Sequence, residues 1–454
     1  MNTPQNNKKV LIISFYFPPS FNPGSVRMGK FAKYLPEFGW DPIILTADRK
    51  TSSSEIMPLE MDELSIYRTP YSTFGDWIST PLVGQPLADS PNSIKQSDKP
   101  SLRKQLLLRS VRMLRPFYTA PLINKLIWDP MGWLPFALKK GKEIIAQQNI
   151  DIILSTYNPS LPHLIASKLS KQSGIPWVAD FRDLWSHNPY FKKTQPFQLF
   201  EEHWEKRVIK NSDYLISVSN PLINDLESFH SKKVAVIYNG FDDADFKENI
   251  PSCSKFTITY TGQIYSPTSD PEPLFQVLAE LKREGIVSSS SIEVRFFGRF
   301  LVNNPAILSI KYDIADIVHV HGFIPLKESI KKQKESSALL LLGWNDPQAA
   351  GDITSKFFEY MGAGKPILAI AYQGGELNQL IQKADVGVIV NTPIQIKELL
   401  LRWLTEFKQY GKVISYFHPN NEVVKHYTRK EETKELACIL NQVSLKNGTW
   451  QKHK

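Results

Sequence analysis

The sequence contains little cysteine and no long hydrophobic run. It holds two cysteines in 454 residues, Cys253 and Cys438, far apart and outside any spacing typical of metal ligands. This pattern excludes a disulfide framework and a cysteine-based zinc site, and it indicates a reducing cytoplasm. No apolar run approaches the roughly 20 residues that span a bilayer. The start passes from a short polar tail into an apolar run without a signal-peptide cleavage site, so we expect a cytoplasmic globular protein.

Basic residues are in excess. The chain carries 54 Lys and Arg against 45 Asp and Glu, a formal net charge of +9, with 42% hydrophobic and 22% charged residues. The overall balance is that of an ordinary globular protein. The positive excess favours an anionic partner, such as a nucleotide, a nucleic acid or an acidic membrane surface, and does not choose among them.

Short apolar runs alternate with helix-like stretches, which is typical of βαβ units and parallel sheets. In the first half we predict strands at 10–14, 42–46, 151–155, 176–179, 214–218 and 234–237, with helices at 25–38, 134–147, 161–173 and 197–210. In the second half we predict strands at 256–260, 292–297, 317–320, 338–342, 366–370 and 387–390. The fold class is therefore α/β, with two Rossmann-like doubly wound parallel-sheet domains, at 1–245 and 246–411, and a charged helical tail at 412–454.

Residues 70–127 interrupt the alternation. Residues 75–101 are rich in turn formers, and residues 102–115 predict an amphipathic helix ended by Pro116, with arginines opposite its apolar side. Two interpretations stay open. The basic helix lies in an anionic membrane interface, or the insert is a lid whose apolar side covers its own domain.

Polar residues follow two strands of the first half. Gly24 and Ser25 open the helix after the first strand, where backbone amides favour an anion such as a diphosphate; a plain strand–helix turn is the alternative. Asp180, Arg182 and Asp183 follow the strand at 176–179. We expect Arg182 to hold a phosphate or orient a carboxylate, and Asp180 or Asp183 to accept a hydroxyl proton. The alternative is an Arg–Asp pair that caps the next helix.

Three turns of the second half predict walls of a nucleotide pocket, because ligands of open α/β sheets bind at the carboxyl ends of strands. Gly262 and Gln263 follow one strand, Arg299 follows the next, and Phe323 and Ile324 precede a helix. Glycines that end strands are individually commonplace. Several in matching places of one half favour a shared ligand.

The stretch "GDITSKFFEYMGAGKPILA" at 351–369 combines a helix start with a cation and a carboxylate. Ser355 and Lys356 are predicted at the helix N-terminus, where amides, a hydroxyl and an ammonium can meet a diphosphate. Glu359 lies three residues later on the same face and can accept hydrogen bonds from both ribose hydroxyls. We predict a turn at 362–364 that lets the next strand pack closely. The alternative is a Lys–Glu pair on the helix surface.

Four stretches together resemble glycosyltransferase family 4, whose members have the GT-B fold and retain anomeric configuration. They are "SFYFPPSFNPGSVR", "YLISVSNPLINDL" followed by "VAVIYNGFDDADF", "ITYTGQIY" and "SKFFEYMGAGKPILAI". The last two, with "GIPWVADFRDLW", also resemble a subset of bacterial surface-polysaccharide transferases. The resemblance implies that Glu359 contacts the ribose of the sugar donor and that the tail at 412–454 crosses back over the N-terminal domain.

The sequence also departs from the family pattern. The first glutamate of the family's E-x7-E motif falls at Gly351, and we expect Asp352 beside it to substitute. The Arg and Lys that many members carry after Gly262 are absent, which leaves more of the diphosphate charge to Lys356 and Arg182. The histidine that follows the corresponding N-domain strand of the family is replaced by the cluster at 180–183.

The resemblance implies a retaining hexosyl- or N-acetylhexosaminyl-type transferase that uses a nucleotide diphosphate sugar, with UDP preferred, and a saccharide or lipid-linked saccharide acceptor of bacterial surface-polysaccharide synthesis. No metal or other cofactor is expected. Localisation is expected in the cytoplasm, peripheral at the inner face of the plasma membrane where the 102–115 helix binds it. A nucleic-acid partner is not expected, because basic and aromatic residues do not alternate as in a stacking groove. A nucleotide-sugar epimerase of the same fold and a non-catalytic, nucleotide-binding membrane partner remain alternatives.

Overall fold

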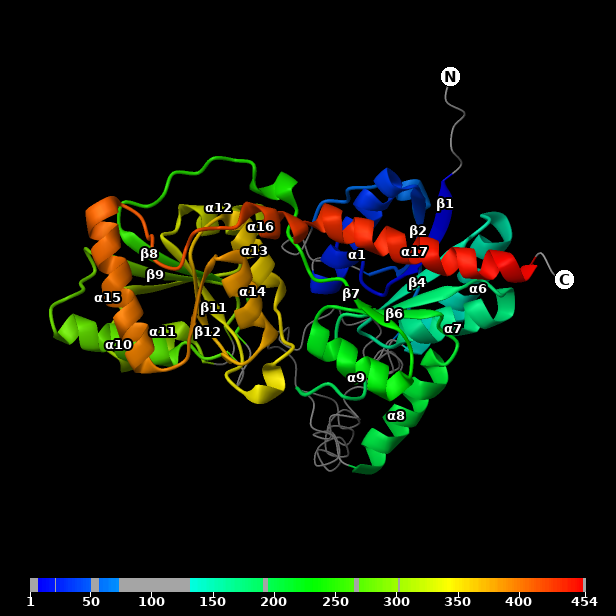
Figure 1. Cartoon of the computed structure of the whole chain (residues 1–454), viewed down its shortest axis with the longest axis horizontal. Coiled ribbons are helices and arrows are strands. Elements are labelled where there is room, and N and C mark those ends of the chain that lie inside the picture. The colour runs from blue at the N-terminus through cyan, green and yellow to red at the C-terminus, as the bar shows by residue number, and fades with distance from the viewer. Residues whose placement is uncertain are drawn as a thin grey trace, which may run out of the picture. The chain divides into compact units, whose positions relative to one another are not determined.

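The chain forms two compact units (Figure 1). The computed structural model describes residues 7–20, 22–49, 57–72, 131–190, 195–264, 269–300 and 303–451. The basic helix predicted at 102–115 lies outside these residues. Unit 1 comprises Met1–Ile216, Leu226–Ala235 and Ala437–Lys454, and unit 2 comprises Ser217–Asp225 and Val236–Leu436.

Unit 1 is built on a seven-stranded sheet of order β3-β2-β1-β4-β5-β6-β7. The strands are β1 Lys8–Ile13, β2 Trp40–Ala47, β3 Ile66–Thr69, β4 Ile152–Tyr157, β5 Trp177–Phe181, β6 Tyr214–Ser217 and β7 Val234–Val236. The pairs from β3 through β5 are parallel. The helices are α1 Pro23–Tyr34, α6 Leu134–Gln147, α7 Leu161–Ser173, α8 Gln195–Ile209 and α9 Asn220–His230, whose residues through Asp225 belong to unit 2.

Unit 2 is built on a six-stranded sheet of order β10-β9-β8-β11-β12-β13. The strands are β8 Phe256–Thr261, β9 Ile292–Phe297, β10 Val318–His321, β11 Ala338–Leu342, β12 Ile367–Ile370 and β13 Gly387–Val390. The helices are α10 Glu272–Arg283, α11 Pro305–Lys311, α12 Leu326–Glu335, α13 Ser355–Ala363, α14 Glu376–Ala384, α15 Pro393–Tyr410, α16 Asn421–His426 and α17 Arg429–Gln451, whose last residues belong to unit 1.

The sheet of unit 2 is buried on both faces, as expected of a parallel sheet. Successive residues of β11 alternate between two cores: Leu340 and Leu342 pack with α10 and α15, whereas Leu339 and Leu341 pack with α13 and α14 (Figure 1). The strand order reverses between β8 and β11. A doubly wound sheet opens its ligand crevice at the carboxyl ends of the strands beside such a reversal.

The predicted two-sheet α/β class is confirmed, and the boundaries differ locally. The helix predicted at 25–38 ends at Tyr34 and continues as a 3-10 turn, Leu35–Phe38, because Pro36 lacks an amide donor and its ring clashes with the preceding turn. The short strand β3 and helix α9 were not predicted. Of the helices in the described ranges, none combines the length and apolarity needed to cross a bilayer.

Candidate functional site

Two glycine turns meet at the carboxyl edge of the sheet of unit 2. Gly262 follows β8 with φ +119°, and a Cβ on Gly298, after β9, would lie only 2.0 Å from the carbonyl oxygen of Gly262. The backbones of the two turns therefore touch, an approach that only glycine allows at Gly298. A Cβ on Gly262 would in turn lie 2.1 Å from Cε of Lys356, so the lysine side chain occupies the space that this glycine leaves.

Lys356 stands at the start of α13, as the sequence predicts. The helix begins at Ser355, and its N-cap residue, Thr354, makes no side-chain capping hydrogen bond. The Lys356 ammonium lies 5.4 Å from the centre of the Tyr260 ring. A helix N-terminus and a cation thus come together beside the β8 turn, the arrangement that suits an anionic phosphate.

Glu359 lies one helical turn after Lys356 and is partly buried. Desolvation raises the pKa of its carboxyl, and the nearby Lys356 charge opposes that rise. The amide of Gln333, on α12, donates to Glu359 at 3.5 Å and to Thr261 Oγ1 at 3.0 Å. A desolvated carboxylate that keeps acceptor capacity can receive hydroxyl donors, such as those of a ribose.

The turn predicted at 362–364 is only half correct. Gly364 ends α13 in the left-handed conformation, with φ +65°. Gly362 lies inside the helix instead, where a Cβ would meet the Phe241 ring at 2.6 Å. This glycine lets α13 pack on Phe241 and does not form a turn.

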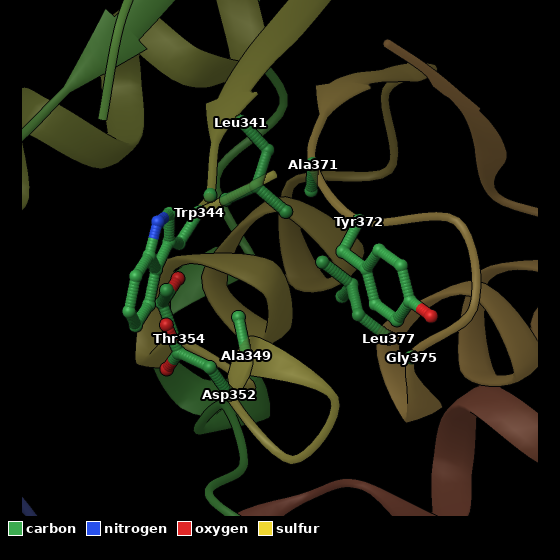
Figure 2. Close-up of a pocket in the computed structure, with 10 residues that line it drawn as sticks. Leu341, Trp344, Ala349, Asp352, Thr354, Ala371, Tyr372, Gly375 and Leu377 are labelled. Atoms are coloured by element: carbon green, nitrogen blue, oxygen red, sulfur yellow. The ribbon is translucent and has the colours of Figure 1, made fainter. Parts of the chain in front are cut away.

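A pocket opens beside α13 at the ends of β11 and β12 (Figure 2). It is lined by Leu341, Gly343, Trp344, Ala349, Asp352, Thr354, Ala371, Tyr372, Gly375 and Leu377. Trp344 and Tyr372 stand on opposite sides, and Asp352 lies below Trp344 in the view. The buried Thr354 hydroxyl has no hydrogen-bond partner within the described part of the chain. Aromatic side chains beside a carboxylate and a hydroxyl are suited to a polyhydroxylated ligand.

The other predicted residues of unit 2 line the same edge. The Arg299 guanidinium lies 5.2 Å from the centre of the Phe323 ring, which joins the β9 and β10 turns. Ile324 follows in the chain, and Gln263 is exposed just after Gly262. The backbone carbonyl of Gln263 accepts a 2.7 Å hydrogen bond from the Tyr260 hydroxyl, which fixes the start of that loop.

In unit 1, the structure brings Gly24, Ser25 and Arg182 together. A Cβ on Gly24 would lie 3.3 Å from the Arg182 guanidinium. Asn22 caps α1 by accepting from the Ser25 amide at 2.9 Å, and the Ser25 side chain is fully buried. Arg182 Nε donates to the Tyr157 carbonyl at 2.9 Å. These contacts hold the guanidinium at the start of α1.

Asp180 is enclosed, which does not fit its predicted role as a proton acceptor. Its carboxylate receives both Nε and an Nη of Arg27, at 3.2 and 3.0 Å, and the Thr156 hydroxyl at 2.8 Å. Arg27 and Asp180 are both fully buried, so this carboxylate holds Arg27 within unit 1. Asp183 differs: its side chain is 43% exposed and lies 3.6 Å from Arg182.

A further carboxylate, that of Glu376, lies near this edge and was not predicted. Glu376, at the start of α14, is buried and accepts from the backbone N–H of Asn220 at 2.8 Å, from its side-chain amide, and from the Tyr238 hydroxyl at 2.6 Å. The pair Gly374–Gly375 after β12 was the available signal, because it marks another strand end. Gln333, Trp344 and Tyr372 were also missed, since each reaches the edge only through tertiary packing.

Known proteins with similar sequences or structures were compared with this chain. Residues 100–245 match the family described as Glycosyltransferase Family 4. The sucrose-phosphate synthase from Thermosynechococcus elongatus superposes with a TM-score of 0.56 at 14% identity, over 98% of each chain. Anabaena HepE, solved in complex with UDP-glucose, gives 0.57 at 11%, over 96% of this chain and 99% of HepE.

A third similar structure is the lipopolysaccharide outer core galactosyltransferase WaaB. It superposes with a TM-score of 0.50 at 13% identity, over 98% of this chain and 99% of WaaB. No curated protein matches the sequence significantly. At these identities the structural matches establish the GT-B fold.

Proposed function

We propose that this chain, which matches glycosyltransferase family 4 over residues 100–245, transfers a sugar from a nucleotide diphosphate donor with retention of anomeric configuration. The observation that carries this proposal is the cluster of Gly262, Lys356 and Glu359. It combines a turn without side chain, a cation at a helix N-terminus and a desolvated carboxylate one turn away. A nucleoside diphosphate offers the matching groups, namely a dianionic diphosphate and a ribose diol.

Each residue has a role in this proposal. Lys356, the amides of Ser355 and those of the Gly262 turn stabilise the diphosphate, whose charge grows as the sugar departs. Glu359 binds the ribose hydroxyls. Arg299, Phe323 and Ile324 line the base, and Gln263 borders the phosphates.

The transferred sugar occupies the pocket of Figure 2, which lies at the same edge as α13. Asp352 and Thr354 hydrogen-bond its hydroxyls, and Trp344 packs on its ring. Asp352 here takes the part that the family gives to a glutamate at the position of Gly351. UDP is the preferred nucleotide, and HepE, with the same fold, was solved with UDP-glucose.

The acceptor is proposed to be a saccharide or a lipid-linked saccharide of surface-polysaccharide synthesis, a chemistry related to that named for WaaB. Arg182, with Gly24 and Ser25, orients an anionic group of the substrates. Asp183, the exposed carboxylate of the cluster, is the candidate that accepts the hydroxyl proton.

Thermal unfolding with UDP, GDP or ADP tests the donor site. A ligand at about 100 times its dissociation constant adds roughly 2.7 kcal/mol to the stability of the state that binds it. We expect one diphosphate to raise the melting temperature of wild type and of Glu398→Ala, an exposed carboxylate on α15, but not of Glu359→Ala. An equal response of Glu359→Ala would refute the ribose assignment.

Product analysis tests the reaction class. Nuclear magnetic resonance of a UDP-sugar incubated with lipid extract should show a new glycoside with the anomeric configuration of the donor. A new sugar isomer without acceptor would identify an epimerase. Tight nucleotide binding without turnover in any extract would identify a non-catalytic partner.

A further inference from the structure

The outward face of α8, in unit 1, carries several large exposed apolar side chains. Three aromatic side chains, Phe197, Phe200 and Trp204, follow one another at spacings of three and four residues and so form one stripe. Phe200 is 65% exposed and Trp204 is 36% exposed. Leu199, 59% exposed, adds to the apolar surface. Large aromatic side chains in water carry a solvation cost that a partner would relieve.

A basic stripe runs beside the aromatic one. His203, Arg207 and Lys210, spaced by four and three residues, occupy the adjacent face, with Lys206 next to them, and all four are exposed. The helix therefore presents aromatic rings and cations side by side.

Two carboxylates of α8, those of Glu201 and Glu205, are buried. Glu201 accepts from the Trp185 indole at 3.2 Å, and Glu205 accepts from the Ser186 amide at 2.8 Å. Glu205 also pairs with His230 at 3.0 Å with both side chains 2% exposed. Glu202 is bound by Gln198 at 3.0 Å. Glu201 and Glu205 are thus buried, and Glu202, 23% exposed, lies 3.3 Å from His187 Nε2, so the cations dominate the outward face.

We propose that this face of α8 docks on the anionic surface of a lipid bilayer. Rings of Trp and Phe enter the boundary between headgroups and acyl chains, and Lys and Arg remain at the level of the lipid phosphates. The charge sign selects this occupant: a face with exposed Lys206, Arg207, Lys210 and His203, on a helix whose Glu201 and Glu205 are buried, is complementary to anionic headgroups. The surface belongs to α8 of unit 1, whereas the proposed donor site is built from residues of unit 2, and the docking proposal does not depend on the proposed reaction.

Vesicle sedimentation of the full chain tests the proposal. Wild type should sediment with vesicles of phosphatidylcholine mixed with phosphatidylglycerol, weakly with phosphatidylcholine alone, and less in high salt. Arg207→Gln/Lys210→Gln should lower the affinity roughly 30-fold, since each cation near the surface contributes about 1 kcal/mol. Lys139→Gln/Lys142→Gln, which removes two exposed cations from α6, should change it little.

The aromatic stripe is tested in parallel. Phe200→Ser/Trp204→Ser should lower the affinity about tenfold or more, whereas Ile307→Ser/Ile310→Ser, two exposed residues of α11, should not. Trp204→Phe should keep binding but lose the part of the fluorescence quenched by brominated lipid, which places the indole itself in the bilayer.

Three results overturn the proposal: no binding of wild type to anionic vesicles, unchanged binding of both α8 double variants, or equal quenching in Trp204→Phe. Light scattering, which measures the oligomeric state, tests whether a second copy of this chain occupies the face instead. A wild-type oligomer that the α8 variants convert to monomer, without vesicle binding, would make this face a protein interface. Melting curves and the UDP response of each variant separate loss of docking from misfolding and from failure of the donor site.

Discussion

The buried pair Arg27–Asp180 gives the sharpest test of how unit 1 is built. Both side chains are fully buried, and the carboxylate receives two guanidinium hydrogen bonds and one from Thr156. Removing one partner of a buried ion pair leaves a desolvated charge and costs about 3–5 kcal/mol. For a unit of this size that corresponds to a fall in melting temperature of roughly 10 °C or more. We expect this loss in Asp180→Asn and in Arg27→Met.

The double variant Arg27→Met/Asp180→Asn separates structure from catalysis. Because it leaves neither charge buried, it should melt well above the level that the two single losses predict by addition. Circular dichroism melting of the full chain measures all four proteins. The reasoning is refuted if Asp180→Asn melts like wild type and loses only sugar transfer, since the carboxylate would then act on substrate.

Four further outcomes follow from the structure. Lys356→Gln should weaken UDP binding about tenfold or more by removing a charge-assisted contact; an unchanged Kd in calorimetry would contradict the diphosphate site. Gly262→Ala should weaken UDP binding too and lower stability by about 1–3 kcal/mol, because φ is +119° and the methyl overlaps Lys356 Cε; calorimetry and melting measure both. Glu376→Gln should destabilise unit 2 by about 1–3 kcal/mol in urea unfolding. The NH₂ of the new side chain would face the Asn220 amide and the Tyr238 hydroxyl, which donate hydrogen bonds to the Glu376 carboxylate. Desolvation, with a smaller effect of the His230 charge, lowers the pKa of buried His163 to about 3. Because the His163 imidazole of the unfolded chain binds a proton near pH 6.5 and that of the folded chain does not, the free energy of unfolding should fall by about 2 kcal/mol between pH 6.5 and 5. Urea unfolding of His163→Phe should show a smaller fall.

The central strands were predictable because each is a short apolar run. β9 and β11 begin and end at the predicted residues. β11 is apolar at every position, as expected of a strand buried on both faces, whereas β9 carries half-buried Glu293 and Arg295 between its buried apolar residues. The edge strand β3, Ile66–Thr69, is half-buried along most of its length. Its sequence carries too few apolar residues to stand out, so only pairing with β2 reveals it.

The site was predictable where it depends on one helix. Helical spacing sufficed to put Lys356 and Glu359 on one face of α13. It did not reveal that Lys356 packs into the space beside Gly262, or that Gln333 links Glu359 to Thr261. Those contacts join α13 to β8 and α12, and no local pattern encodes them.

Burial separated the acidic residues that the sequence grouped together. Asp180 and Asp183 lie three residues apart after the same strand, yet one is enclosed by Arg27 and the other is exposed. Every residue of β5, through Phe181, is buried. Asp180 still lies inside this strand and is therefore enclosed within unit 1. Asp183 lies beyond the strand end.

Packing also accounts for the glycine at position 351, where the family pattern has a glutamate. A Cβ there would lie 3.0 Å from Cβ of Pro221 and 3.1 Å from the Ser219 hydroxyl. Glu376 fixes the same segment through the backbone and side chain of Asn220. A side chain at 351 would therefore push against a segment that is anchored from the next helix. A side chain at 351 would require Pro221 and Ser219 to shift by a few tenths of an ångström, and the carboxylate that lines the pocket next to this position is Asp352.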